Sequence, residues 1–348
     1  MVERVFQQPA NNRARRVIVQ FALNLPTFAG GDFTIEDAAR IKDVARRADE
    51  LGFDALWVAD HIMVAPGLYG TTYLTALLCL AHCASVTTKI RLGAGILVLP
   101  YYHPVSLAHE IQSLQYLSAG RFVLGIGSGW AEHEFEALGM HLNERGRRTD
   151  EVLSALRPLL TERNVSFEGR YYSFQDATVE PILSEFPELW VAGGSRTQTE
   201  LSPDRASIAP AVLRRIADAD GWLARSAGNQ EMVKSDLKTI RAYLQSHGRD
   251  PDSLRYGHVN FAYVVDTDDH EEALRIQRPR FERVMGTHRS FEHLQQSYMM
   301  GTTQEIVDRI ADLERSGIEY LVLAMLDHDL DQLERLSSEI VSRFQKAS

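Results

Sequence analysis

Short apolar runs alternate with amphipathic segments along most of the chain. The runs have the length and composition of buried strands, and the segments between them carry apolar residues at helical spacing. Strands that alternate with helices pair in parallel through right-handed crossovers. About eight such units predict an α/β fold, a (β/α)8 TIM barrel, and an open doubly wound sheet is the alternative. The predicted strands cover residues 17–23, 54–59, 90–99, 121–127, 188–194, 221–224, 256–266 and 318–326.

Residues at the ends of the amphipathic segments indicate where the helices begin and end. Thr34 can cap a helix that ends at Gly52. A second helix is predicted over about 72–86, and Pro104 is placed to open a third. After the fourth strand, alternating residues around a Glu-Gly turn predict an insertion hairpin near 163–180.

Composition and charge narrow the class of protein. The chain has 348 residues, of which 45% are hydrophobic and 24% charged, which excludes a disordered chain. Its net charge of −10 argues against a nucleic-acid or anionic-membrane partner, because such partners need a basic face. Two cysteines in an apolar stretch suit a reducing compartment, and no apolar run reaches the roughly 18 residues of a membrane span. We expect a cytoplasmic protein with a flexible polar head over 1–16 and a single barrel domain over 17–348.

Polar, aromatic and glycine residues gather where the predicted strands end, and a barrel builds its active site at those C-terminal ends. Asp60 and His61 follow the second strand. Imidazole can give or take a proton near neutral pH, and the alternative is a rim histidine bonded to a loop carbonyl. We find no metal-ligating pattern in the sequence. The other strand ends contribute Asn24, Tyr101, His103, Gly127, Ser128, Gly129, Trp130, Gly193, Gly194, Ser195, Asp327 and His328.

Two glycine turns follow predicted strands. The turn at 125–130, GIGSGW, can approach a flat ring or a phosphate, and the alternative is a tight strand–helix turn. Its third glycine comes one position too early for a dinucleotide fingerprint, which disfavours a Rossmann-type NAD(P) dehydrogenase. The turn at 191–195, VAGGS, suits a phosphate cradle, and the alternative is a hairpin turn.

Three longer runs occur in an order typical of one family: ADELGFDALWVADH, LSAGRFVLGIGSGWAEHEFEALG and GTTQEIVDRIADLERSGIEYLVL. They resemble the bacterial-luciferase-like flavin oxidoreductases, and the likeness covers about residues 17–330. The second run is similar to that of the subgroup that uses the deazaflavin coenzyme F420, while FMN-dependent members share the barrel and several motifs. The resemblance implies a TIM barrel with an insertion, in agreement with the strand count.

The resemblance also implies roles for individual residues. The family's catalytic histidine corresponds to His61, behind the acidic Asp60. A non-prolyl cis peptide that backs the flavin ring corresponds to the bond Gly95–Ile96. The family's sugar-phosphate dehydrogenases carry a glutamate where this chain has Trp130, which argues against a sugar-phosphate substrate. The implied cofactor-binding residues are Gly95, Ile96, Gly127, Ser128, Gly129, Gly193, Gly194 and Ser195, with the cofactor phosphate near the last three.

The resulting hypothesis is an oxidoreductase that transfers a hydride between F420 and a small organic substrate. His61 would shuttle a proton and Asp60 would fix its tautomer. An FMN-dependent monooxygenase that uses O2 and reduced FMN from a separate reductase is the alternative. A non-catalytic flavin-binding protein is a second alternative. We expect a homodimer, and a substrate pocket lined by Asn24, Tyr101, His103 and Trp130.

Overall fold

Eight parallel strands form a closed barrel, as predicted from the alternation of strands and helices. The computed structural model describes residues 19–30, 33–64, 71–195, 207–226 and 228–345. Each strand pairs with the next in parallel register, and the pairing of β7 with β10 closes the ring. The strands are β1 (Gln20–Asn24), β3 (Ala55–Val58), β5 (Arg91–Ala94), β7 (Phe122–Gly127), β10 (Leu189–Ala192), β11 (Gly221–Ala224), β12 (Arg255–Phe261) and β13 (Tyr320–Ala324).

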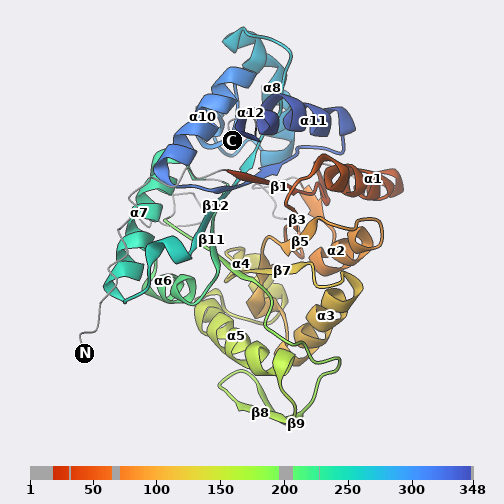
Figure 1. Ribbon diagram of the computed structural model, residues 1–348, viewed down its shortest axis with the longest axis vertical. Helices are drawn as coiled ribbons and strands as arrows, with labels where there is room; N and C mark the ends of the chain where they lie inside the picture. The colour runs from red at the N-terminus through yellow and green to blue at the C-terminus, as the bar shows by residue number, and fades with distance from the viewer. Residues whose placement is uncertain (1–18, 31–32, 65–70, 196–206, 227, 346–348) are drawn as a thin grey trace, which may run out of the picture.

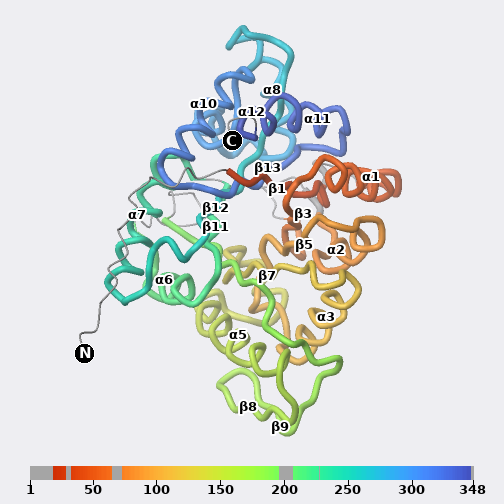
Figure 2. Tube along the Cα trace, in the orientation of Figure 1, coloured from red at the N-terminus to blue at the C-terminus, as the bar shows by residue number. Residues whose placement is uncertain are grey.

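The first and last strands of the barrel come from opposite ends of the sequence. β1 and β13 pair over five residues and lie side by side in Figure 2. The predicted third strand is divided in two, because β5 is followed by β6 (Leu97–Val98), which pairs with β7. The peptide bond between the two pieces, Gly95–Ile96, is cis, as the resemblance implies.

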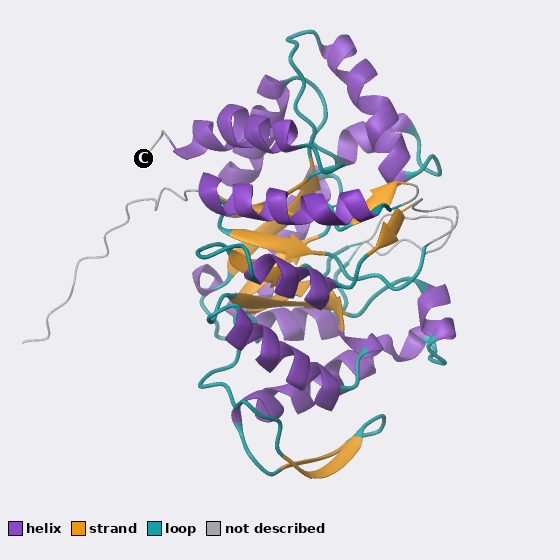
Figure 3. Ribbon diagram, turned by 90° about the vertical axis from the view of Figure 1, so that its right-hand side faces the viewer, coloured by secondary structure: helices purple, strands orange, loops and turns teal. Residues whose placement is uncertain are grey.

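Helices surround the barrel and cover its strands (Figures 1 and 3). Thr34 and Asp37 form a capping box at the start of the first helix, and Gly52 ends it with a φ of 79°, a left-handed conformation that favours glycine. The helices are α1 (Ile35–Leu51), α2 (Ala76–Ala84), α3 (Pro104–Leu117), α4 (Glu132–Ala137), α5 (Arg145–Thr161), α6 (Pro210–Ala217), α7 (Gln230–Ser246), α10 (Thr303–Ser316), α11 (Leu330–Arg335) and α12 (Ser342–Gln345).

Two insertions extend the molecule beyond the barrel. The predicted hairpin is present as β8 (Val165–Glu168) and β9 (Ser173–Ala177), at the lower end of Figure 1. α8 (His270–Met285), at the upper end of Figure 1, and α9 (Phe291–Ser297) come between β12 and β13 in the sequence and were not predicted. They form an apolar cluster of their own with Phe28.

One predicted helix begins later than expected. The helix placed at 72–86 starts at Ala76, because Thr71–Tyr73 forms a short strand, β4. This strand pairs antiparallel with β2 (Phe28–Gly30) in a two-stranded sheet separate from the barrel. Tertiary pairing has therefore overridden the local helical pattern at these positions.

Large aromatic side chains fill the barrel interior. The rings of Trp57, Trp190 and Tyr320 pack against one another with centroids 4.9 to 6.3 Å apart. Trp57 Nε1 donates a hydrogen bond to the hydroxyl of Tyr320 at 3.1 Å. A Cβ on Gly93 would come within 2.6 Å of the Trp57 ring, so glycine is needed at this close approach. The interior is thus a packed core rather than a pore.

Two sequence predictions concern the ends of the chain and the membrane. The predicted polar head, residues 1–16, lies outside the described residues, so the division of the chain into head and barrel stays a prediction. Within the described ranges, no helix combines the length and apolar character that crossing a membrane requires.

Candidate active site

A cavity of about 380 Å³ lies at the C-terminal ends of the barrel strands. Barrel enzymes use this face because several loops converge on it. Tyr101, His103 and Ser195 do not line this cavity, although the sequence predicted them as site residues. The predicted residues that do line it are Asn24, Asp60, His61, Gly95, Ile96, Gly127, Ser128, Gly129, Trp130, Gly193 and Gly194.

His61 follows β3, lines the cavity and contacts two aromatic rings. Its ring centroid lies 4.9 Å from that of Tyr73 and 5.7 Å from that of Trp130. Its Nδ1 lies 3.2 Å from Oε2 of Glu134, a residue of α4. Its Nε2 makes no hydrogen bond with any residue in the described ranges. The imidazole is therefore fixed at one nitrogen and open at the other.

Glu134 is the buried carboxylate that holds this part of the site together. It accepts hydrogen bonds from the backbone N–H of Ile62 at 2.7 Å and of Met63 at 2.9 Å, and from the hydroxyl of Tyr101 at 2.7 Å. Burial by itself raises the pKa of Glu134, but the hydrogen bonds from His61 and Met63 outweigh it and lower that pKa to about 2. Glu134 is therefore ionised at neutral pH.

The charge of Glu134 determines the tautomer of His61. A carboxylate can only accept hydrogen bonds, so Nδ1 of His61 must be the donor. In the neutral ring, Nε2 then carries the lone pair and can accept a proton. This arrangement gives the cavity wall a base whose orientation is fixed by a second residue.

Asp60 does not have the role that we expected from its place next to His61. Its Oδ2 accepts hydrogen bonds from the backbone N–H of Val98 and from the hydroxyl of Tyr102, each at 3.0 Å. Burial raises the pKa of Asp60, and these two hydrogen bonds oppose that effect. The carboxylate hydrogen-bonded to His61 is Glu134, while Asp60 links the segment after β3 to Val98 of β6 and to Tyr102.

The glycine turn after β7 lies close to the cis peptide. A Cβ on Gly127 would overlap Cδ1 of Ile96, so a larger residue fits here only if the Ile96 side chain moves. The Ser128 hydroxyl is hydrogen-bonded to Thr149 Oγ1 at 3.0 Å and to Nη1 of the buried Arg215 at 3.2 Å. Gly95, Ile96 and Gly127 therefore form a closely packed part of the cavity wall. The neighbouring Ser128 side chain is fixed by its hydrogen bonds to Thr149 and Arg215.

The predicted phosphate cradle after β10 is only partly open to the cavity. Gly193 and Gly194 line the cavity. Ser195 instead donates from its backbone N–H at 2.8 Å and from its hydroxyl at 2.6 Å to the carboxylate of Asp236. The N–H that we expected to hold a phosphate is therefore bonded to an internal carboxylate.

The remaining two predicted residues stand behind or outside the cavity. The Tyr101 hydroxyl binds Glu134, so this side chain supports the site from behind. His103 caps α3 and packs against Tyr172 with ring centroids 5.3 Å apart. Both residues follow a strand that ends at the cavity, so the sequence favours a place in the cavity wall for each. Neither side chain takes that place.

Sequence reasoning missed two arginines that line the cavity, Arg225 and Arg289. Arg225 directly follows β11, so the rule that strand ends carry function applies to it as well. Arg289 lies between α8 and α9, in an insertion that the pattern of strands and helices in the sequence did not predict.

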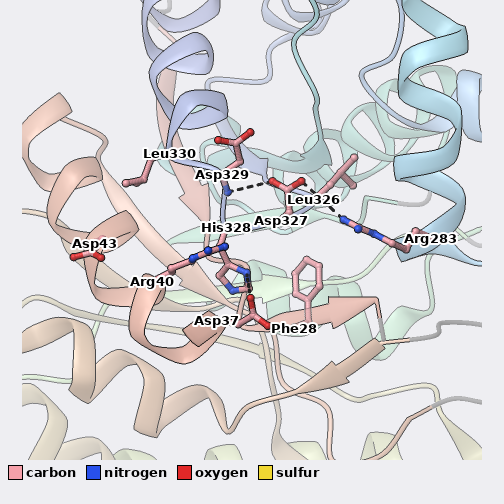
Figure 4. Close-up of a pocket in the computed structure, with 10 residues that line it drawn as sticks. All are labelled: Phe28, Asp37, Arg40, Asp43, Arg283, Leu326, Asp327, His328, Asp329 and Leu330. Atoms are coloured by element: carbon pink, nitrogen blue, oxygen red, sulfur yellow. Dashed lines mark hydrogen bonds and ion pairs between the residues drawn. The ribbon is translucent and has the colours of Figure 1, made fainter. Parts of the chain in front are cut away.

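A second cavity, of about 700 Å³, adjoins the first and is lined mostly by charged residues (Figure 4). Phe28 lines both cavities. Asp327 and His328, which the sequence placed at the barrel mouth, line the second cavity and not the first. There, Nδ1 of His328 lies 3.7 Å from Oδ1 of Asp37, and Oδ2 of Asp327 lies 3.9 Å from Nη2 of Arg283.

Comparison with known proteins agrees with this fold. Residues 19–320 match the family described as luciferase-like monooxygenase. The chain is 24% identical to an FMNH(2)-dependent dimethylsulfone monooxygenase of Pseudomonas fluorescens (strain Pf0-1), over 93% of each chain. It is 27% identical to an F420-dependent glucose-6-phosphate dehydrogenase of Microbacterium testaceum (strain StLB037), over 86% of this chain and 91% of that protein.

A solved structure shows the same fold. Monooxygenase RslO1 from Streptomyces bottropensis superposes with a TM-score of 0.76 at 22% identity, over 93% of this chain and 99% of that one. The family match covers most of the chain, and the homologues comprise both monooxygenases and F420-dependent dehydrogenases. The protein is therefore an oxidoreductase that belongs to the luciferase-like monooxygenase family.

Proposed function

We propose that this protein transfers a hydride between coenzyme F420 and a small organic substrate, with His61 as the proton shuttle. The observation that carries the proposal is the pair formed by His61 and Glu134 at the wall of the cavity. Hydride transfer to or from a carbonyl group also requires that a proton be given to or taken from its oxygen. Nε2 of His61 is the atom that can make this exchange.

The proton transfer follows from the geometry of the pair. When an alcohol is oxidised, its carbon loses a hydride and its hydroxyl loses a proton to Nε2 of His61. The resulting imidazolium is stabilised by the Glu134 carboxylate, 3.2 Å from Nδ1. In the reverse direction the same imidazolium protonates the oxygen of the reduced carbonyl.

The cavity wall suits a planar cofactor. Gly95, Ile96 and Gly127 would face the ring system, and the close approach of Gly127 to Ile96 leaves no room for a further side chain. F420, when bound, supplies a ring carbon that accepts or releases the hydride. Gly193 and Gly194 would face the phosphate-bearing part of the cofactor.

A second candidate is an FMN-dependent monooxygenase. It is favoured by the likeness, over 93% of the chain, to an FMNH(2)-dependent dimethylsulfone monooxygenase. In this case reduced FMN would come from a separate reductase, and His61 would protonate oxygen intermediates. Under either function, a homodimer and a cytoplasmic location stay predictions.

Cofactor titration tests the proposal directly. F420 and FMN are added separately to the purified protein, and binding is followed by fluorescence. Tight F420 binding together with reduction or oxidation of F420 in the presence of small alcohols or ketones supports the proposal. FMN binding without F420 binding replaces it with the monooxygenase, and binding without any turnover indicates a non-catalytic flavin protein.

The role of His61 is tested by its replacement. We expect His61→Ala to lower turnover at least about 100-fold while the dissociation constant of the cofactor stays within about threefold, because the imidazole handles the proton rather than the cofactor. His103→Ala is the matched control, since His103 lies outside the cavity, and it should leave both quantities unchanged. An unaltered rate for His61→Ala would remove this residue from the mechanism.

A further inference from the structure

We propose that Arg225 and Arg289 form a subsite for an oxyanion of the substrate, such as a sulfonate, phosphate or carboxylate group. This inference rests on the proposed function and names the substrate class that the cavity fits. Both arginines line the same cavity as His61.

The topology of the barrel places this subsite across the mouth from His61. In the ring of eight strands, β11 is four strands away from β3 in either direction. Arg225 follows β11 directly, and His61 follows β3. A substrate that presents its reacting hydroxyl or carbonyl oxygen to Nε2 of His61 and extends across the mouth therefore ends beside Arg225.

Arg289 shows a hydrogen-bonding capacity that the described protein does not use. Its Nε is buried and has no hydrogen-bond partner among the residues described. A buried donor that is left without an acceptor is costly, and a charged one more so. An oxyanion bound in the cavity would compensate the charge of this guanidinium group, which presents several N–H groups in a plane that matches such ligands.

The local charge balance also favours an anion. Burial lowers the pKa of His293, and the nearby charges of Arg289 and Arg225 lower that pKa further. Both positive charges therefore lie close enough to the His293 ring to affect it. Asp60 is the one acid among the described residues that line the cavity, and its carboxylate already accepts hydrogen bonds from Val98 and Tyr102.

One further carboxylate lies within electrostatic range of Arg225. This is Asp236, whose pKa Arg225 lowers against the larger raising effect of burial. Its two oxygens accept the hydrogen bonds of Ser195. Asp236 therefore balances part of the charge of Arg225 but leaves the Nε of Arg289 without an acceptor.

Sulfate is a suitable probe, because it presents the shared oxyanion chemistry. We would measure its dissociation constant by calorimetry, with sodium chloride of equal ionic strength as reference, for the protein with and without bound cofactor. We expect millimolar binding that Arg289→Gln weakens at least tenfold and Arg289→Lys weakens less. Arg283→Gln is the matched control, since Arg283 lies near the end of α8, six residues before Arg289, but lines the other cavity.

A second arm distinguishes the substrate from the cofactor as the source of the anion. FMN and riboflavin differ by a phosphate group, so we would compare their binding to wild type and Arg289→Gln. Equal effects on the two ligands support a substrate subsite. Weaker binding of FMN alone would assign the arginines to the cofactor phosphate and overturn the proposal.

The remaining outcomes are also decisive. Sulfate binding that Arg289→Gln and Arg289→Lys both leave unchanged would overturn the subsite. If neither F420 nor FMN binds, the proposed function fails, whereas the loss of sulfate binding in Arg289→Gln, measured without cofactor, would still support an oxyanion site. The two failures are therefore separable.

Discussion

At the scale of single residues, neighbours in the sequence serve different parts of the site. Asp60 binds Val98 and Tyr102, whereas His61 binds Glu134. Successive residues of an extended chain point to opposite sides, so adjacency does not predict contact. The carboxylate that fixes His61 lies 73 residues further along the chain.

The first prediction concerns the function of Glu134. Glu134→Gln keeps the size of the side chain but removes the charge that stabilises the imidazolium of His61. We expect turnover to fall by about 10- to 100-fold, as for other groups that orient a catalytic residue, with little change in cofactor affinity. Steady-state kinetics and cofactor titration measure the two effects. Glu132→Gln, an exposed position on the same helix, is the control and should behave as wild type.

The second prediction concerns pH and stability. The pKa of Glu134 is about 2 in the folded protein, below its ordinary value of 4.5. A lowered pKa contributes stability above the unfolded value, and this contribution is lost as the pH falls from about 4.5 towards 2. The full contribution is on the order of 3 kcal/mol, of which about 2 kcal/mol is lost between pH 6 and pH 3.

Urea unfolding of wild type and Glu134→Gln at pH 6 and pH 3 measures this loss. Other carboxylates titrate in both proteins, so the difference between the two declines isolates Glu134. We expect the free energy of unfolding of wild type to decline more steeply, by about 2 kcal/mol. Parallel declines would contradict the prediction.

At the scale of elements, the sequence predicted the barrel better than its additions. Strands such as β7 are buried on both faces and appear as continuous apolar runs, so they are visible without any partner. The pairing of β2 with β4 involves three residues on each side and depends on contacts distant in sequence. The alternation of strands and helices in the sequence did not predict the α8–α9 insertion. Arg289 lies in this insertion, so the sequence did not predict it as a site residue either.

The third prediction compares two glycines of one strand, β7. A Cβ on Gly125 would overlap the backbone carbonyl oxygen of Ala94, which cannot move without distorting β5. A Cβ on Gly127 would meet Cδ1 of Ile96, the end of a flexible side chain. We therefore expect Gly125→Ala to destabilise the protein by about 3 kcal/mol and Gly127→Ala by about 1 kcal/mol.

The effects of the two variants on cofactor binding should have the opposite order. Rotation of Ile96 in Gly127→Ala would push its side chain into the cavity, so we expect cofactor affinity to fall about tenfold, the equivalent of 1.4 kcal/mol. Urea unfolding and fluorescence titration measure the two properties. Equal losses of stability would contradict the packing argument, and unchanged affinity in Gly127→Ala would place the cofactor elsewhere.

At the scale of the whole molecule, the overall charge opposes the charge of the cavity. The chain carries a net charge of −10, yet Arg225 and Arg289 face the mouth of the barrel. An anionic ligand is therefore repelled at long range and attracted at short range. Salt shortens the reach of the repulsion, because the Debye length falls from about 30 Å at 0.01 M to about 8 Å at 0.15 M.

The last prediction follows from this opposition. The association rate of FMN, which carries a phosphate, should rise roughly threefold as sodium chloride is increased from about 10 to 150 mM, because the overall repulsion is screened first. Riboflavin has no charge and should associate at a constant rate, which makes it the control. Stopped-flow fluorescence measures both rates. A fall in the FMN rate with salt would mean that the arginines, rather than the net charge, govern the approach, and local attraction would then extend well beyond the cavity.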